Sequence, residues 1–309
     1  MTAYYCMPKV SIIIPIYGVE KYIKRCAESL FSQTLDDMEF IFIDDCTPDK
    51  SMEILASEIE KNRQRFAEMN WTVRTERMTS NNGLPAVRRH GINLCTGDYV
   101  IHCDSDDWVC NDIYHKLYNK AISEDLDIVW CAFYRSDGIN HTFFSDEKQP
   151  YLMQGPLWNK MVRRSIYTEN EIIYPTANKA EDGALMMQLS FLSKSRGYLD
   201  EPLYYYFINR ASICGQIDET ACLRKLEEEC SNVDIRVEFL KKHQCEKKYQ
   251  KDIVLWKYTA RNNLLPLLKQ KKYRELWKGT YPEIERYILY SHHIPIKIKL
   301  GYVKKILGL

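Results

Sequence analysis

The 309-residue chain lacks several signals that would assign it directly to a protein class. Its 11 cysteines form no Cys-x-x-Cys pair, which excludes a zinc ribbon and a thioredoxin-type redox motif. No run approaches the ~18 apolar residues that a transmembrane helix requires, and the N-terminus lacks a signal-peptide pattern. We therefore expect a globular, cytoplasmic protein with reduced cysteines.

Nucleotide-binding and nucleic-acid motifs are also missing. A dinucleotide-binding dehydrogenase needs Gly-x-Gly-x-x-Gly after its first strand, but this region offers only Gly18. The glycine-rich loop expected of a nucleotidyltransferase is absent, and no nucleic-acid recognition motif accompanies the basic residues. These absences weigh against a dehydrogenase, a nucleotidyltransferase and a nucleic-acid-binding protein, and we expect no nucleic-acid partner.

The net charge of +1 conceals an uneven distribution of charge. From Lys241 to the C-terminus there are 17 basic and 5 acidic residues, whereas the first 240 residues carry 26 basic and 37 acidic residues. An acidic body with a basic tail suggests that the tail meets an anionic surface.

Strand-like and helix-like segments alternate along the first ~130 residues, which predicts an α/β fold with a mostly parallel central sheet. Val10 to Pro15 is an apolar, β-branched run typical of a strand that is buried on both faces. Further strands are expected at residues 40–43, 71–74, 99–103 and 127–133, and helices at 19–30, 47–59, 84–94 and 113–122.

The remainder of the chain divides into an irregular part and a helical part. Residues 135–215 show only a helix at 184–191 and a strand at 203–208, while the chain beyond Glu219 is helical. One apolar seam there packs either on the body or on a second copy in a homodimer. Its members are Leu223, Leu226, Cys230, Val233, Val237 and Leu240.

Carboxylates at the ends of strands are the main chemical signal. The second strand runs into Asp44 and Asp45, and the fourth runs into Asp104, Asp106 and Asp107. Ligands of parallel sheets bind beyond the carboxyl ends of the strands. Three clustered carboxylates repel one another unless a cation such as Mg²⁺ or Mn²⁺ neutralises them. The pattern fits a metal held against a diphosphate, and a solvated acidic turn is the alternative.

Five motifs in order resemble the family-2 glycosyltransferases with the GT-A fold, over residues 8–213. They are VSIIIPIYGVEKYIKRCAESLFSQT, FIDDCTPDKS, NNGLPAVRRHGINLCTGDYVIHCDSDDWV, WNKMVRRSIY and AEDGALMMQL. The resemblance implies a GT-A, Rossmann-like domain over residues 1–215, with a nucleotide-binding half (1–110) and an acceptor-side half (111–215). Residues 216–309 then form a helical C-terminal extension.

The resemblance also implies roles for individual residues. The donor nucleotide is expected to meet Pro15, Tyr17, Glu20, Asp45, Asp104 and Ser105. Either Asp106 or Asp107 is the main metal ligand, and the sequence does not decide between them. Asp182 is the expected catalytic base, although Glu181 and Asp182 also suit the first turn of a helix without any catalytic role.

Three basic residues and Glu181 have weaker assignments. Arg88 either touches the nucleotide or lies on a helix surface, and the family usually has Asn where this chain has Arg89. Lys160 and Glu181 are assigned to the acceptor side. Arg210 resembles a residue of a late loop that closes on the diphosphate in relatives.

The implied activity is metal-dependent, inverting transfer of one sugar. The donor is a nucleotide sugar, most simply a UDP-sugar, the cofactor is Mn²⁺ or Mg²⁺, and the acceptor is a hydroxyl of a glycan or lipid-linked molecule in bacterial surface-polysaccharide synthesis, such as lipopolysaccharide or capsule. The Gln-x-x-Arg-Trp element of processive synthases is absent, which favours transfer of a single sugar. The alternative is a non-catalytic nucleotide-sugar-binding or scaffolding protein on the same fold.

Residues 294–309 form a basic amphipathic tail. The segment contains Lys297, Lys299, Lys304 and Lys305 and no acidic residue, and Leu300, Val303, Ile306 and Leu307 fall on one helical face. Such a helix can lie in an anionic membrane interface. We expect peripheral binding at the inner face of the cytoplasmic membrane, with packing on the body or a frayed terminus as alternatives.

Overall fold

The computed structural model describes residues 7–209 and 217–307. They form two compact units, one of residues 7–174 with 185–209 and the other of residues 175–184 with 217–307. The predicted domain boundary after residue 215 falls outside the described residues, so that division stays a prediction.

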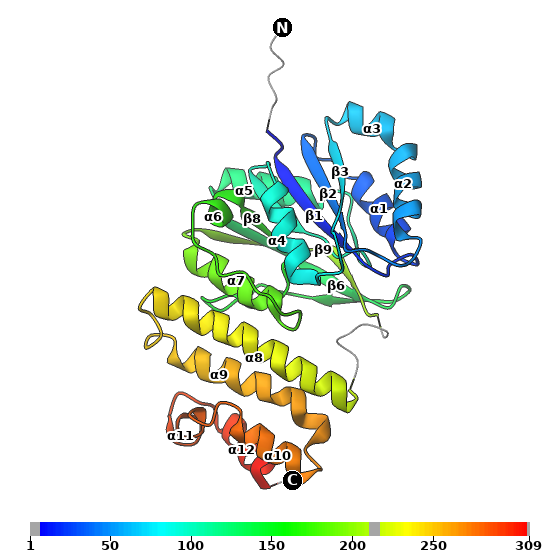
Figure 1. Ribbon diagram of the computed structural model, residues 1–309. Coiled ribbons are helices and arrows are strands. Elements are labelled where there is room, and N and C mark those ends of the chain that lie inside the picture. Colours follow the sequence, from blue (N-terminus) through cyan, green and yellow to red (C-terminus); the bar gives the residue numbers. More distant parts are fainter. Residues whose placement is uncertain (1–6, 210–216, 308–309) are drawn as a thin grey trace. The chain divides into compact units, whose positions relative to one another are not determined.

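The first unit is built on one mixed sheet (Figure 1). Its described strands have the order β3-β2-β1-β4-β8-β6-β9-β5, with β7 paired to β6. The neighbours β3, β2, β1 and β4 are parallel, as are β6 and β9, whereas β8, β5 and β7 pair antiparallel. The strands are β1 (Val10–Ile16), β2 (Met38–Asp44), β3 (Thr72–Arg77), β4 (Tyr99–His102), β5 (Trp108–Val109), β6 (Ile128–Ser136), β7 (His141–Phe144), β8 (Lys160–Arg163) and β9 (Arg196–Phe207).

Strand β1 shows why the sheet is covered on both faces. Ile12 and Ile14 belong to one buried cluster, and Ile13, which points the other way, belongs to a second. Residues of α1 (Ile23–Phe31), α3 (Arg63–Glu68) and α5 (Ile113–Ser123) join the first cluster, together with residues of α2 (Ser51–Lys61). The second cluster takes residues of α4 (Leu84–Leu94), α6 (Arg164–Thr168) and α7 (Glu181–Leu192). The predicted α/β fold is therefore confirmed.

Helix α4 is the best-predicted element, since its observed bounds are those expected from the sequence. Its Gly91 lies tight against the sheet, where an added Cβ would be 2.6 Å from a methyl group of Ile13. This close approach brings the buried face of α4, including Arg88, against the central strands.

The helix predicted at residues 47–59 begins later, at Ser51. Residues 47–50 instead form a turn in which Oδ1 of Asp49 accepts hydrogen bonds from the Thr47 hydroxyl (2.8 Å) and the Ser51 backbone N–H (3.1 Å). Asp side chains often organise turns in this way. The Thr-Pro pair thus precedes the helix instead of starting it.

The described part of the second unit consists of helices and the turns that join them, and the irregular residues 175–180 precede its first helix. Its elements are the start of α7 and then α8 (Glu219–Lys242), α9 (Gln250–Arg261), the 3₁₀ helix η2 (Asn262–Leu267), α10 (Lys271–Gly279), α11 (Ile284–Tyr290) and α12 (Ile296–Leu307). Leu226 of the predicted α8 seam lies in a buried cluster with Val254 and Tyr258. Part of the seam therefore packs within this unit, and the homodimer stays a prediction. None of the helices in the described ranges combines the length and apolar character needed to cross a bilayer.

Candidate active site

The loops that follow β1, β2 and β4 meet at one edge of the sheet. These strands are parallel neighbours, so their carboxyl ends share that edge. The Ser105 hydroxyl donates a hydrogen bond to the Pro15 carbonyl (2.6 Å), and the Asp45 backbone N–H donates to the Ile16 carbonyl (3.0 Å). The structure thus brings together Pro15, Asp45 and Ser105, three of the predicted donor-binding residues.

Asp45 is buried and organises the loop that leads into α4. One of its carboxylate oxygens accepts a hydrogen bond from the Asn82 backbone N–H (2.8 Å) and the other from that of Gly83 (2.9 Å). Gly83 has a φ of +80°, a conformation that favours glycine. The resemblance assigned Asp45 to the donor nucleotide, and the sequence did not predict this contact with the loop before α4.

The segment from Tyr17 to Glu20 is fixed by backbone hydrogen bonds to the turn before α2. Gly18 N–H donates to the Thr47 hydroxyl (2.8 Å), and Glu20 N–H donates to the Asp49 carboxylate (2.9 Å). Oε2 of Glu20 in turn accepts from the Lys50 N–H (3.2 Å). Tyr17 stays 52% exposed at this rim, where its ring is available to a ligand.

Asp104 is paired with an arginine that arrives from α4. Nη2 of Arg88 donates to Oδ1 of Asp104 at 2.8 Å, and the Arg88 side chain is buried whereas the carboxylate is partly exposed. The predicted alternative that Arg88 lies on the surface of its helix is therefore wrong. Its observed contact is with Asp104, and contact with a nucleotide stays a prediction.

Asp106 is partly exposed, and its surroundings disfavour the charged form of its carboxylate. Burial and the nearby charge of Asp104 raise the pKa of Asp106 to about 6. Arg25 of α1 donates to the Asp106 carbonyl (2.9 Å) and stacks its guanidinium over the Trp108 ring at 3.7 Å. Arg25 is a site residue that the sequence did not reveal, because three strands and three helices separate it from residue 106 along the chain.

Asp107 has a different environment from its neighbours. It is buried, and its two oxygens accept hydrogen bonds from the Tyr204 hydroxyl (2.7 Å) and the Phe207 backbone N–H (2.7 Å). Burial and the charges of Asp104 and Asp106 raise its pKa well above the usual value. Both oxygens of Asp107 therefore have partners from β9, which sequence reasoning also did not foresee.

The donor set at this edge suits a hard divalent cation. Burial and, after it, repulsion from Asp104 raise the pKa of Asp106, and a bound cation would relieve that repulsion. Oxygen donors are what Mg²⁺ and Mn²⁺ prefer. Within residues 7–209 and 217–307 no three His, Cys, Asp or Glu side chains form a complete metal-binding group. Two carboxylates with further oxygens from a phosphate-bearing ligand are compatible with that finding.

The residues predicted for the acceptor side and the catalytic base lie in different parts of the chain's structure. Nζ of Lys160 is buried and lies 3.0 Å from the Asp146 carboxylate and 2.8 Å from Oδ1 of Asn159. Glu181 is buried and Asp182 half-buried at the start of α7, in the second unit. The Asp182 carboxylate accepts a hydrogen bond from the Gly183 N–H (2.7 Å). Arg210 lies outside the described residues.

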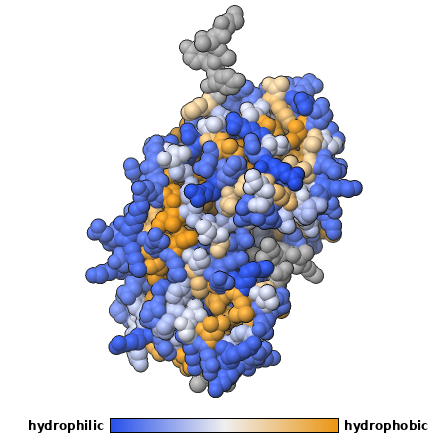
Figure 2. Space-filling view, in the orientation of Figure 1, coloured by the Kyte–Doolittle hydropathy of each residue, from blue (hydrophilic) through white to orange (hydrophobic). Residues whose placement is uncertain are grey.

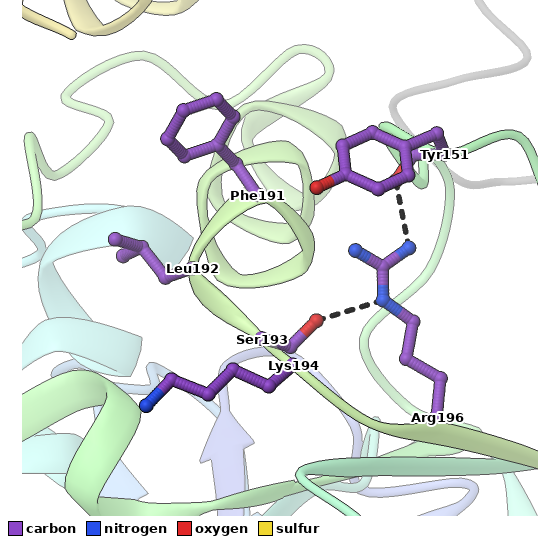
Figure 3. Close-up of a pocket in the computed structure, with 6 residues that line it drawn as sticks. All are labelled: Tyr151, Phe191, Leu192, Ser193, Lys194 and Arg196. Atoms are coloured by element: carbon purple, nitrogen blue, oxygen red, sulfur yellow. Dashed lines mark hydrogen bonds between the residues drawn. The ribbon is translucent and has the colours of Figure 1, made fainter.

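A shallow pocket of about 550 Å³ lies away from this edge (Figure 3). Arg196, at its rim, donates to the Ser193 hydroxyl and the Tyr151 carbonyl, both at 2.7 Å. Arg196 pairs with Ile128 at the amino ends of β9 and β6. Because β6 and β4 are both antiparallel to β8, these amino ends lie at the edge opposite Asp104. The pocket is therefore separate from the carboxylate site.

Comparison with known proteins supplies the family. The model of "Glycosyl transferase family 2" matches residues 11–184, more than half of the chain. The putative glycosyltransferase EpsH of Bacillus subtilis is 31% identical over 225 residues, covering 67% of this chain and 62% of that protein. The poly(ribitol-phosphate) beta-glucosyltransferase of Bacillus spizizenii is 29% identical over 215 residues, covering 65% and 32%. The chain thus spans less than two thirds of the length of both relatives.

A solved structure with the same fold is that of S. aureus TarS 1–349 in complex with UDP-GlcNAc. The TM-score is 0.62, the sequence identity is 18%, and the alignment covers 96% of this chain and 92% of that one. This likeness shows the GT-A fold with its helical extension.

Proposed function

The chain belongs to glycosyl transferase family 2, and from that premise we propose that it moves a single sugar from a UDP-sugar to an acceptor hydroxyl with inversion, in a metal-dependent reaction. That it is a glycosyltransferase follows from the family. The main observation that supports the proposed donor and metal is the pair of carboxylates, Asp104 and Asp106, at the carboxyl edge of the parallel strands.

The donor nucleotide would occupy the edge formed by the loops after β1, β2 and β4. Tyr17 offers an exposed ring for the base, and Asp45 and Ser105 lie in the loops on either side. Asp104, oriented by Arg88, can accept hydrogen bonds from ribose hydroxyls with the oxygen that Arg88 does not hold. UDP-GlcNAc in TarS, which has the same fold, supports the choice of a uridine nucleotide.

Asp106 is the better candidate for the metal ligand. Asp107 is buried and both of its oxygens already accept hydrogen bonds, from Tyr204 and Phe207, so a cation there would compete with these donors. Asp106 has a raised pKa that a cation would lower. When bound, Mn²⁺ or Mg²⁺ supplies Lewis-acid stabilisation of the diphosphate leaving group.

Asp182 would act as the general base. A carboxylate can take the proton of the acceptor hydroxyl as that oxygen attacks the anomeric carbon and the bond to the diphosphate breaks. Attack from the face opposite the leaving group inverts the anomeric configuration without a covalent enzyme intermediate. Glu181, buried beside it, and Lys160, paired with Asp146, would support the acceptor side indirectly.

The acceptor would be a glycan or a lipid-linked saccharide of the bacterial surface. The relative that glucosylates poly(ribitol phosphate) supports a polymeric acceptor. Lipopolysaccharide and capsule stay predictions, as does the donor sugar.

A membrane-facing role for α12 supports a lipid-linked acceptor. Ile296, Leu300 and Val303 are exposed on α12, and Lys297 and Lys304 are exposed beside them. Ile306, predicted to share this face, instead packs towards the buried cluster around Trp277 and Tyr302. Figure 2 shows an apolar area over the C-terminal helices bordered by hydrophilic residues. We propose that this side of α12 contacts anionic lipid at the inner face of the cytoplasmic membrane.

A thermal-shift screen of UDP-glucose, UDP-galactose, UDP-GlcNAc and GDP-mannose, with and without Mn²⁺, tests this function. A donor that binds the folded state raises the melting temperature. We expect a UDP-sugar to do so only with Mn²⁺ or Mg²⁺, and UDP release from it to depend on Asp106. Binding without any UDP release to water or to saccharide acceptors would favour the non-catalytic scaffold.

A further inference from the structure

Three side chains of α8 hold the irregular segment that leads into α7. Oε2 of Glu228 accepts a hydrogen bond from the Lys179 N–H (3.1 Å). Nδ2 of Asn232 donates to the carbonyls of Ala177 (2.7 Å) and Lys179 (2.8 Å). Nη2 of Arg236 donates to the Ala180 carbonyl (3.2 Å). We call Glu228, Asn232 and Arg236 the α8 clamp.

The spacing of the α8 clamp follows from helix geometry. Residues four apart lie one turn above each other on the same face, so the three side chains form a row along α8. Residues 177–180 have no regular structure, and the α8 clamp supplies partners for backbone groups that a helix or strand would otherwise satisfy. The row thus contacts the backbone of three of the four residues directly before Glu181 and Asp182.

The held segment contains a strained residue. Ala180 has a φ of +63°, which costs about 1 kcal/mol or more for a residue with a side chain. Such a conformation persists only where the surroundings fix it. The hydrogen bond from Arg236 to the Ala180 carbonyl lies at this position, two residues before Asp182.

Arg236 is built into the unit as a buried cation. It is 5% exposed, and its guanidinium carbon lies 5.3 Å from the centre of the Trp256 ring of α9. Burial lowers the pKa of Arg236, and the charges of Asp182 and Glu229 oppose that effect. The positive charge is therefore placed where it interacts with the carboxylate assigned as the base.

We propose that the α8 clamp positions Asp182 for proton abstraction, with Arg236 fixing both the Ala180 turn and the charge beside the carboxylate. This inference rests on the proposed function of Asp182. Glu228, Asn232 and Arg236 are positioning residues, because they act through the backbone of residues 177–180 and the charge on Asp182. A general base displaced by ~1 Å can lose ~100-fold in rate, so the effect should fall on kcat.

The test compares Arg236→Met, Arg236→Lys and Asn232→Ala with a matched control, Arg224→Met, which removes an exposed arginine of the same helix. Each variant is assayed for UDP release from the UDP-sugar found in the thermal-shift screen, with Mn²⁺ and saccharide acceptors. Melting temperature and the dissociation constant of UDP are measured in parallel to identify variants that fail to fold.

We expect Arg236→Met and Asn232→Ala to lower kcat by at least ~10-fold while the donor KM changes less than ~2-fold, because the donor edge is untouched. Arg236→Lys should recover part of the loss, and Arg224→Met should match the wild type. In an Asp182→Asn background, Arg236→Met should cause little further loss. If folded Arg236→Met and Asn232→Ala both keep wild-type kcat while Asp182→Asn is inactive, the α8 clamp has no positioning role. If Asp182→Asn itself keeps wild-type kcat, the assignment of the base is wrong.

Discussion

Nη2 of Arg88 lies 2.8 Å from Oδ1 of Asp104, which joins the buried face of α4 to the first carboxylate after β4. The arginine is almost fully buried, and its ion pair with Asp104 contributes to compensating its charge. The orientation of Asp104 therefore depends on α4 as well as on the strand that carries it.

Replacing Arg88 with Met should weaken donor binding by about 10-fold or more, because the freed Asp104 carboxylate loses its fixed orientation. Isothermal titration with UDP and Mn²⁺ measures the change. Arg89→Met is the matched control, since Arg89 is exposed and lies over the Tyr174 ring at 5.2 Å. Equal UDP affinity in Arg88→Met and Arg89→Met would show that the ion pair does not orient the site.

Asp106 and Asp107 should respond differently to the same substitution. Asp106→Asn should abolish the dependence of UDP binding on Mn²⁺, since it removes the carboxylate whose negative charge a bound cation would stabilise. Asp107→Asn should retain that dependence but lower the free energy of unfolding by about 1–3 kcal/mol, because an amide cannot accept from both Tyr204 and Phe207 with its nitrogen. Mn²⁺ titrations and urea unfolding separate the two effects, and the opposite pattern would exchange the roles.

His102 should make folding stability sensitive to acid. Its ring is buried, burial lowers its pKa well below the usual value, and within the described part of the chain neither ring nitrogen has a hydrogen-bond partner. Below pH ~6.5 the unfolded chain binds a proton that the folded state refuses, so the free energy of unfolding falls by up to ~1.4 kcal/mol per pH unit. Urea unfolding between pH 7.5 and 5.5 should show a shallower decline for His102→Met than for the wild type. Parallel curves would mean that the pKa of His102 does not differ between the folded and the unfolded state.

The exposed side of α12 gives a prediction about lipid. Leu300→Glu replaces an exposed apolar side chain with a negative charge and should lower binding to phosphatidylglycerol vesicles by at least ~10-fold. Ile122→Glu, at an exposed position of α5, is the matched control and should bind as the wild type does. Co-sedimentation that is unchanged in Leu300→Glu would remove the membrane proposal.

The sequence predicted the central strands because they are short, apolar and buried on both faces, as β1 and β2 illustrate. It did not predict β5, β7 or β8. Trp108 and Val109 form a strand only through pairing with Tyr205 and Tyr204, and two residues carry no periodic signal. Strand β8 likewise depends on partners far along the chain.

The site residues were likewise predictable only where the local sequence revealed them. Carboxylates placed after strands could be found by position, and the resemblance supplied their roles. The partners that fix them could not, because Arg25, Tyr204 and the Asn82–Gly83 backbone reach the site from other elements. The α8 clamp was hidden for the same reason, since Arg236 and Ala180 are separated by 56 residues of sequence.

The anomalous signal of manganese, from a crystal of the full chain grown with UDP and Mn²⁺, would locate the metal and the nucleotide together. We expect one manganese peak within ligand distance of the Asp106 carboxylate and of the UDP diphosphate, with the ribose beside Asp104. A peak elsewhere, or UDP bound away from this edge while Asp104 and Asp106 face only solvent, would contradict this expectation.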